Sequence, residues 1–217
     1  MNISLNMVPM RWVYFGFSIL GFGIFGLATG VLMSEPMAVI GMDRLPELTC
    51  LQMAGTTDRA ITILSAFNKT ELLALQDLLI PGDMVFAWGY GFLFTGLLGL
   101  LTLRLSGTWL SVGRYLMWAP LLASVFDVLE DIGLNEMVAM FAAEPIEFYS
   151  TVALLTTFFA SVKYILLAIV GPMYGISACV KSIASDRRLP SIGLYILLVL
   201  LSFSMIQKPL LEIPACF

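Results

Sequence analysis

The chain has 217 residues, of which 59% are hydrophobic and only 12% are charged, whereas soluble domains average roughly 45–50% apolar and about 25% charged residues. This composition excludes an ordinary soluble globule and indicates an integral membrane protein. The 15 acidic residues outnumber the 11 basic ones, so no basic excess is present to bind nucleic acid. The absence of histidine excludes histidine-ligated haem, the common zinc sites and Ser-His or Cys-His nucleophiles.

Apolar stretches close to the 20 or so residues that a helix needs to cross a bilayer occur five times along the chain. We expect transmembrane spans at 12–33, 84–103, 115–135, 149–170 and 189–206. The expected fold is an all-α, polytopic membrane helix bundle with about five transmembrane helices, which forms a single membrane domain over 1–217. The first stretch is longer than the roughly 7–15 apolar residues of a signal-peptide core, which favours an uncleaved anchor.

The distribution of Lys and Arg predicts the orientation, because short cytoplasmic loops are enriched in both residues. On one expected face lie Arg11, Arg104, Arg114, Lys181, Arg187 and Arg188. On the other face lie Arg44, Arg59, Lys69 and Lys208. This bias predicts a cytoplasmic N-terminus and an outer C-terminus, and we expect the membrane to be a bacterial inner membrane.

The first outer loop, 34–83, is too long for a simple connection and is expected to be structured. Thr57 is predicted to cap one amphipathic helix, and a second is predicted to start at Asn68, where Glu71 completes a capping-box pattern. Pro81-Gly82 would end the second helix. Two such helices would lie flat at the interface or form a lid over the outer mouth of the bundle. The sequence leaves two roles open for these helices: passive packing, or action as a gate or as a platform for a partner.

The three cysteines allow one disulfide in this topology. Cys50 and Cys216 both fall on the outer side, whereas Cys179 falls near the inner face. A bridge between the first two is therefore possible in an oxidising compartment. Three unrelated thiols are the alternative, because the sequence does not give the Cα separation that a bridge requires.

Polar residues inside the third span are the main candidates for a site. Ser124, Asp127, Asp131 and Asn135 are spaced by three, four and four, so they share one helical face, and Glu130 flanks it. A carboxylate at the bilayer centre costs at least ~2.5–3.5 kcal/mol on insertion scales. This face should therefore point into the bundle.

Lys163 is the one basic residue deep within an expected span. From the helical rise, its backbone lies about 9 Å in height from that of Asp127, and both side chains lean toward each other. Asp127–Lys163 is accordingly the first-choice intramembrane pair. Glu130 and Asp131 are placed about 4–6 Å higher than Asp127, nearer to water.

Three further residues complete the predicted polar core. Asp83 opens the second span, where it either caps the helix or lies at the height of Asp131. Tyr90 and Tyr164 are placed to donate hydrogen bonds into the interior. Buried like charges do not all ionise cheaply, so at least one acid should hold a proton at neutral pH. The acids alone would suit a hard metal ion, but the pattern is not specific, and we predict neither a metal nor a cofactor.

Small residues in the first span include the spacing Gly26-x-x-x-Gly30, which lets helices approach closely. We expect this pair to serve packing within the bundle rather than dimerisation. The sequence contains no Walker A, no G-x-S-x-G and no CxxC motif.

Several short motifs carry a resemblance to a family. They are Ala54-Gly55-Thr56 before Arg59-Ala60, Asp83 with Tyr90, Phe126-Asp127-Val128-Leu129-Glu130-Asp131, and Lys163-Tyr164. Over residues 50–175 the chain resembles an uncharacterised family of small bacterial polytopic membrane proteins, with a Phe-Asp-x-x-Glu-Asn element in a middle span and a lysine in a later one. Asp131 replaces the asparagine of that element. The resemblance implies a shared inner constellation of residues and no activity.

Three functions remain open from the sequence. The first is proton- or cation-linked transport of a small solute through the carboxylate–lysine core. The second is a non-catalytic accessory or assembly subunit of a larger membrane complex. The third is a membrane-embedded enzyme for a lipid or isoprenoid, with Glu130 or Asp131 as general acid or base and Lys163 stabilising negative charge. The expected partners are the lipid bilayer and either other membrane proteins or further copies of the chain.

Overall fold

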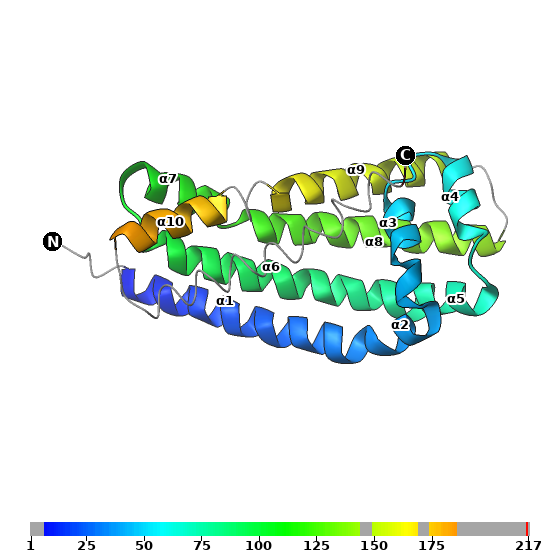
Figure 1. Ribbon diagram of the computed structural model, residues 1–217, viewed down its shortest axis with the longest axis horizontal. Coiled ribbons are helices and arrows are strands. Elements are labelled where there is room, and N and C mark those ends of the chain that lie inside the picture. The colour runs from blue at the N-terminus through cyan, green and yellow to red at the C-terminus, as the bar shows by residue number, and fades with distance from the viewer. Residues whose placement is uncertain (1–6, 144–148, 169–173, 186–215, 217) are drawn as a thin grey trace.

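Four long helices form the body of the molecule. The computed structural model describes residues 7–143, 149–168, 174–185 and 216, and this part of the chain contains helices and turns but no strand. The long helices are α1 (Met7–Leu27), α6 (Ile80–Thr102), α8 (Ala119–Ala143) and α9 (Tyr149–Ala168). They lie side by side in that order, with α6 between α1 and α8, and α9 against α8 (Figure 1). The expected all-α fold is confirmed for the described residues.

Among the described residues, four helical stretches are long and apolar enough to cross a membrane: Met10–Leu32, Lys69–Thr102, Gly107–Ala143 and Ser150–Leu167. Each overlaps one of the first four predicted spans. The fifth predicted span, 189–206, lies outside the described residues. A short helix, α10 (Ile176–Ser185), lies at the end of the bundle where α1 begins, opposite the end that holds residues 34–74 (Figure 1).

The short helices between α1 and α6 gather at one end of the bundle, which we call the short-helix end (Figure 1). They are α2 (Ser34–Ile40), α3 (Leu45–Gln52), α4 (Thr57–Leu64) and α5 (Lys69–Ala74), with a 3-10 turn at Met42–Arg44. Both α3 and α4 pack against α8 and α9. The sequence predicted the second pair of helices but missed the first. Pro36 and Pro46 each lie in a first helical turn, where a proline removes no hydrogen bond.

The capping box at the start of α5 is confirmed. The Asn68 side chain accepts hydrogen bonds from the backbone N–H groups of Thr70 and Glu71, at 2.9 and 3.0 Å. The Asn68 backbone N–H donates in return to the Glu71 carboxylate at 2.7 Å. The predicted cap of α4 was wrong, because Thr57 is already helical and the preceding Thr56 makes no side-chain capping bond.

The prediction that Pro81-Gly82 ends a helix was also wrong. The chain stays helical from Lys69 to Thr102. A π turn at Leu75–Leu79 directly precedes α6, in which Pro81 is the second residue. The wider i→i+5 turn accommodates a proline that would otherwise clash with the carbonyl four residues before it. Asp83 therefore follows helical residues and has no free helix start to cap.

The third span differs from its predicted bounds because two helices contribute to it. A separate helix, α7 (Gly107–Leu116), precedes α8, and α8 continues to Ala143, well beyond the predicted end at Asn135. The acidic residues thus lie in the middle of a 25-residue helix. Glu130 and Asp131 were expected to be more accessible to water than Asp127, yet both are 0% exposed.

Glycines set the contact between α1 and α6, but not the pair that the sequence singled out. A Cβ at Gly89 would lie 2.7 Å from the backbone nitrogen of Phe25, and one at Gly21 would overlap the backbone of Leu93. Neither Gly26 nor Gly30 would meet any atom within 4 Å. The packing role predicted for that pair was wrong, because it lies on the outer face of α1.

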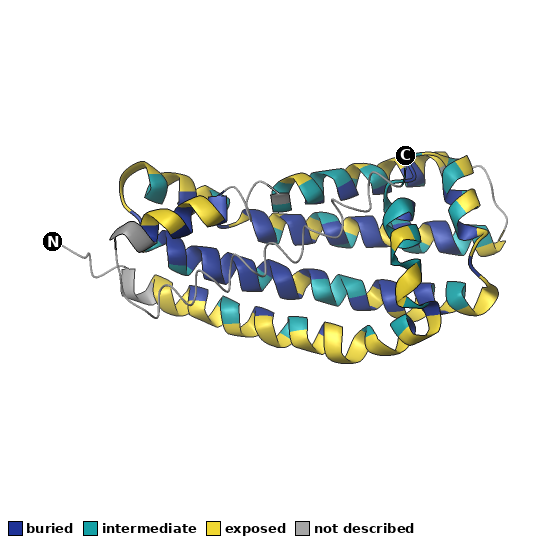
Figure 2. Cartoon of the chain, viewed as in Figure 1, coloured by how far each residue is buried: buried dark blue, intermediate teal, exposed yellow. Residues whose placement is uncertain are grey.

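The outer faces of the long helices are apolar, while polar residues lie inside. Figure 2 shows α1 largely exposed and the inner helices α6 and α8 largely buried. The exposed apolar residues include Phe15, Ile19, Phe22, Leu129, Leu154 and Phe158. The buried polar residues include Thr95, Asp127, Glu130, Asp131, Thr156 and Lys163. This distribution, the reverse of that in a soluble bundle, suits a protein surrounded by lipid.

Candidate functional site

Two close helix contacts bring the site together. Between α6 and α8, a Cβ at Gly91 would lie 2.9 Å from the Cβ of Ser124. Between α8 and α9, a Cβ at Gly133 would lie 3.3 Å from the Cβ of Thr156. Small residues at these crossings allow the backbones to approach. Side chains from all three helices can therefore meet in one buried region.

Lys163 on α9 joins two carboxylates of α8. Its Nζ lies 2.6 Å from Asp127 Oδ1 and 2.6 Å from Glu130 Oε2. The lysine and Asp127 are 5% and 4% exposed. The structure thus contains the pair that we proposed first from the sequence. It adds Glu130 as a second partner, because residues three apart on a helix share a face that one long lysine can span.

Two tyrosines surround this ion pair. The Tyr90 hydroxyl on α6 donates to Asp127 Oδ2 at 2.8 Å, so both oxygens of Asp127 have partners. The Tyr164 ring lies beside the ammonium group, with 4.8 Å from Lys163 Nζ to the ring centroid. A cation at this distance from an aromatic face is attracted by the ring. Lys163 is therefore held by two carboxylates and one ring.

Asp131 has no such partner. It is adjacent to Glu130 and 0% exposed, and neither of its oxygens has a hydrogen-bond partner among the described residues. Asp131 and the half-buried Asp83 of α6 line one cavity of about 40 Å³. The rest of the lining comes from α3, the π turn before α6, and α6 and α8, namely Leu48, Leu51, Gln52, Leu75, Leu79, Ile80 and Leu134.

Two predicted members of the polar core do not join it through any hydrogen bond that the structure gives. The Ser124 hydroxyl donates to the backbone carbonyl of Leu121 at 2.8 Å. Asn135 is half-buried, and its side-chain oxygen has no hydrogen-bond partner among the described residues. The polar face of α8 therefore does not act as one network, and its centre is at Asp127, Glu130 and Asp131.

Gln52 connects α3 to α9, and no pattern in the sequence pointed to it. Its side-chain oxygen accepts from the Tyr164 hydroxyl at 2.7 Å, and its backbone carbonyl accepts from Thr157 Oγ1 at 3.1 Å. The backbone N–H of Gly55 donates to the same Thr157 oxygen at 2.9 Å. More than 100 residues separate these partners, so no local pattern marks them.

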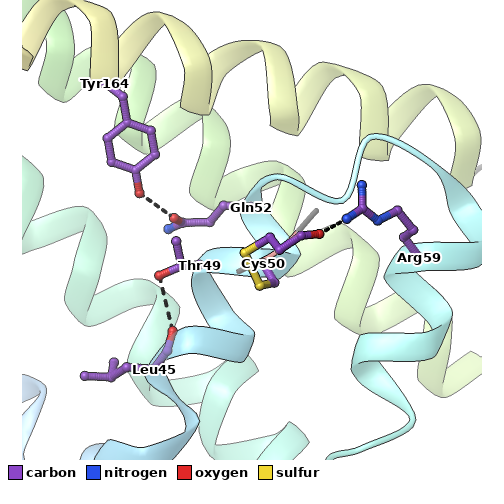
Figure 3. The surroundings of a disulfide bond; sticks show 7 residues. Leu45, Thr49, Cys50, Gln52, Arg59 and Tyr164 are labelled. Atoms are coloured by element: carbon purple, nitrogen blue, oxygen red, sulfur yellow. Dashed lines mark hydrogen bonds between the residues drawn. A yellow bond between two sulfur atoms is a disulfide. The ribbon is translucent and has the colours of Figure 1, made fainter. Parts of the chain in front are cut away.

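A disulfide fixes the same helix. Cys50 on α3 is bonded to Cys216, with 5.1 Å between their Cα atoms. Arg59 donates to the backbone carbonyl of Cys216, and Figure 3 shows this contact beside the Tyr164–Gln52 hydrogen bond. The remaining cysteine, Cys179, is buried, and burial raises the pKa of its thiol to about 11. The wall of the cavity that α3 provides is thus held in place by covalent and polar contacts.

The acids of α8 are close enough together to bind a cation. One carboxylate oxygen from each of Asp127, Glu130 and Asp131 lies within 4.8 Å of the others. A purely carboxylate set suits hard ions. The Lys163 ammonium already contacts the first two residues, so it supplies the positive charge at that part of the cluster.

Comparison with known proteins adds no assignment. No family model, curated protein or solved structure matches this chain.

Proposed function

We propose that this chain is an integral membrane protein that couples the movement of a small solute to that of a proton or another cation. The observation that carries the proposal is the charge imbalance of a buried cluster. Asp127, Glu130, Asp131 and the nearby Asp83 face a single described ammonium group, that of Lys163. Carboxylates that share a buried site do not all stay ionised without added positive charge. A cluster of this kind binds and releases protons or cations.

The surroundings of the cluster support this function. The helices that hold it present apolar side chains outward, and ionisable residues within such helices commonly mark ion or substrate paths. The cavity beside Asp131, about 40 Å³ in volume, has room for a water molecule. It is far smaller than the space a lipid chain needs, so the volume favours a small ion over a lipid or isoprenoid substrate.

We place the N-terminus in the cytoplasm and the short-helix end outside a bacterial inner membrane. Arg11, Arg104, Arg114 and Lys181 belong to the end of the bundle where α1 begins (Figure 1). Basic residues are commoner on the cytoplasmic side. The Cys50–Cys216 disulfide lies at the other end, and disulfides persist in oxidising compartments. The number of spans in this chain is small for a transporter, which also favours an oligomer.

The test is ion flux through the purified protein in proteoliposomes that contain a pH-sensitive dye. Under an imposed pH gradient and a clamped membrane potential, we expect the wild type to dissipate the gradient faster than protein-free vesicles. Asp127→Asn and Glu130→Gln should remove that difference. Glu136→Gln is the matched control, because Glu136 is exposed on the same helix. Equal rates for the wild type and both cluster variants, with all three folded, would overturn the proposal.

A second candidate is an accessory subunit of a larger membrane complex. Gly26 and Gly30 are exposed on α1, and no atom lies within 4 Å of a Cβ built at either. Such a spacing lets a helix from another protein approach α1 closely. Purification of the native protein in a mild detergent distinguishes the two functions. A stoichiometric partner lost in Gly26→Leu favours the subunit, whereas an isolated chain with flux activity excludes it.

A further inference from the structure

The buried acids fall into two groups with different partners. Asp127 and Glu130 contact the Lys163 ammonium at 2.6 Å each, and Asp127 also accepts from Tyr90. Asp131 receives no hydrogen bond from the described residues and, with Asp83, lines the cavity instead. The first group thus has a positive counter-charge within the protein, whereas the second has none among the described residues.

An unpartnered carboxylate in this position has a large energetic cost. Asp131 is 0% exposed, and a buried charge is stable only when it is paired or coordinated. The other residues lining the cavity are leucines, an isoleucine, Asp83 and Gln52, and the Gln52 side-chain amide makes no hydrogen bond to Asp131. The Gln52 side-chain oxygen is itself an acceptor for Tyr164. The second acid across the cavity increases the repulsion, so a bound cation would stabilise both carboxylates in their ionised form.

We propose that the cavity between Asp83 and Asp131 is the binding site of one hard metal cation with oxygen ligands. Both carboxylates line the cavity, and both Asp131 oxygens are free of other partners among the described residues. Its volume accommodates an ion with a water ligand. Aspartate and water oxygens are the ligands that Ca²⁺, Mg²⁺ and similar ions prefer.

The cation binds here and not at the centre of the three acids of α8. An ion at that centre would compete with Lys163 Nζ for Asp127 and Glu130, which already contact it at 2.6 Å. On the cavity side, Asp131 faces only Asp83 and uncharged residues. Two carboxylates carry two negative charges, so a divalent ion matches the site better than a monovalent one. This site extends the proposed function by naming where the coupling ion binds. The ion's role in coupling rests on the proposed function, whereas the binding of the ion does not.

The experiment measures ion binding to the full-length protein in detergent after dialysis against a chelator. We expect CaCl₂ or MgCl₂ to raise the thermal unfolding midpoint by several degrees at concentrations well above the dissociation constant, and titration calorimetry to give one ion per chain. NaCl at equal ionic strength is the arm for a monovalent ion. A midpoint raised by NaCl to the same extent would overturn binding of a divalent ion and support a monovalent one in the same cavity.

Asp83→Asn and Asp131→Asn should each abolish the shift. Asp77→Asn and Glu136→Gln are matched controls on the same two helical stretches, and both residues are exposed. In chelator, Asp131→Asn should be more stable than the wild type, because it removes a buried charge without a partner. Should Asp131→Asn fail to fold, the half-buried Asp83 provides the readout.

No shift of the wild type with any of the three salts would overturn the site, as would a shift that persists in both cluster variants. The flux assay separates the two proposals. Ion binding without flux supports the site and contradicts the transport function. Proton flux without ion binding supports transport and contradicts the metal site.

Discussion

Lys163 of α9 and Asp127 of α8 form an ion pair of 2.6 Å in the interior of the bundle, across 36 residues of sequence. Glu130 shares the same ammonium group. A buried pair of this kind contributes little when it replaces a well-packed apolar contact, yet the loss of one partner leaves a charge unpaired. The stability of this part of the protein therefore depends on the pairing of Lys163 with its two carboxylates more than on the presence of any one of these charged groups.

Lys163→Met should destabilise the protein by about 3–5 kcal/mol, because Asp127 and Glu130 then lie buried without a counter-charge. Methionine keeps most of the side-chain volume, so the effect reports on charge rather than on a cavity. Thermal or denaturant unfolding in detergent measures it. Adding Asp127→Asn to Lys163→Met should restore part of the loss. A single variant as stable as the wild type would contradict the role of the ion pair.

Tyr90→Phe should cost about 1.5–3 kcal/mol, since it removes a hydrogen bond to a charged acceptor, Asp127. Tyr164→Phe is the matched variant, because its hydroxyl donates to the neutral side chain of Gln52. We expect it to cost about 0.5–1.5 kcal/mol. Both follow from unfolding midpoints of the same preparation. The reverse order of the two effects would show that Asp127 does not rely on Tyr90.

Gly21→Ala and Gly26→Ala should behave differently although both lie on α1. At Gly21 the added methyl group overlaps the backbone of Leu93, so α1 must move away from α6, and we expect a loss of about 1–3 kcal/mol. At Gly26 the methyl group meets nothing within 4 Å. Unfolding midpoints should leave Gly26→Ala at or above the wild type. A comparable loss in both would mean that α1 does not pack against α6 through this face.

Thiol labelling tests the disulfide and the burial of the third cysteine. In the folded, unreduced protein we expect no reaction with a maleimide at neutral pH, because Cys50 and Cys216 are bonded and the buried Cys179 thiol has its pKa raised to about 11. Unfolding without reductant should expose one thiol per chain. Reduction and unfolding together should expose all three, which mass spectrometry counts. In the folded, unreduced protein, a label on Cys50 or Cys216 would contradict the pairing, and a label on Cys179 would contradict its burial.

The sequence was most informative where one helix determines the outcome. Apolar length located the first four spans, and the spacing of Asp127 and Asp131 identified the inner face of α8. It also suggested Lys163 as a partner, because the rise per residue gives the approximate height of a side chain in the bundle. These features depend on local geometry alone.

Other features depend on contacts between distant segments. The helix through Pro81 requires a π turn, which tertiary packing stabilises. The cavity beside Asp131 exists because α3 covers it, and α3 is held there by Thr157, Tyr164 and Cys216. Whether a glycine of α1 touches α6 depends on the rotation of the helix, which spacing does not give. The residues most relevant to ion binding were therefore visible in the sequence, but their division into paired and unpaired acids was not.

The bond between Cys50 and Cys216 makes most of this chain a closed loop. Every helix from α4 to α10 lies within that loop, whereas α1 and α2 lie on the open tail before it. A single backbone cut inside the loop would leave the two pieces joined until a reductant is added. A cut ahead of Cys50 would detach α1, which then stays with α6 only through their glycine-lined contact. Among the long helices of the described chain, α1 is thus the one that could be supplied as a separate peptide, to test whether it reassembles with the rest of the protein.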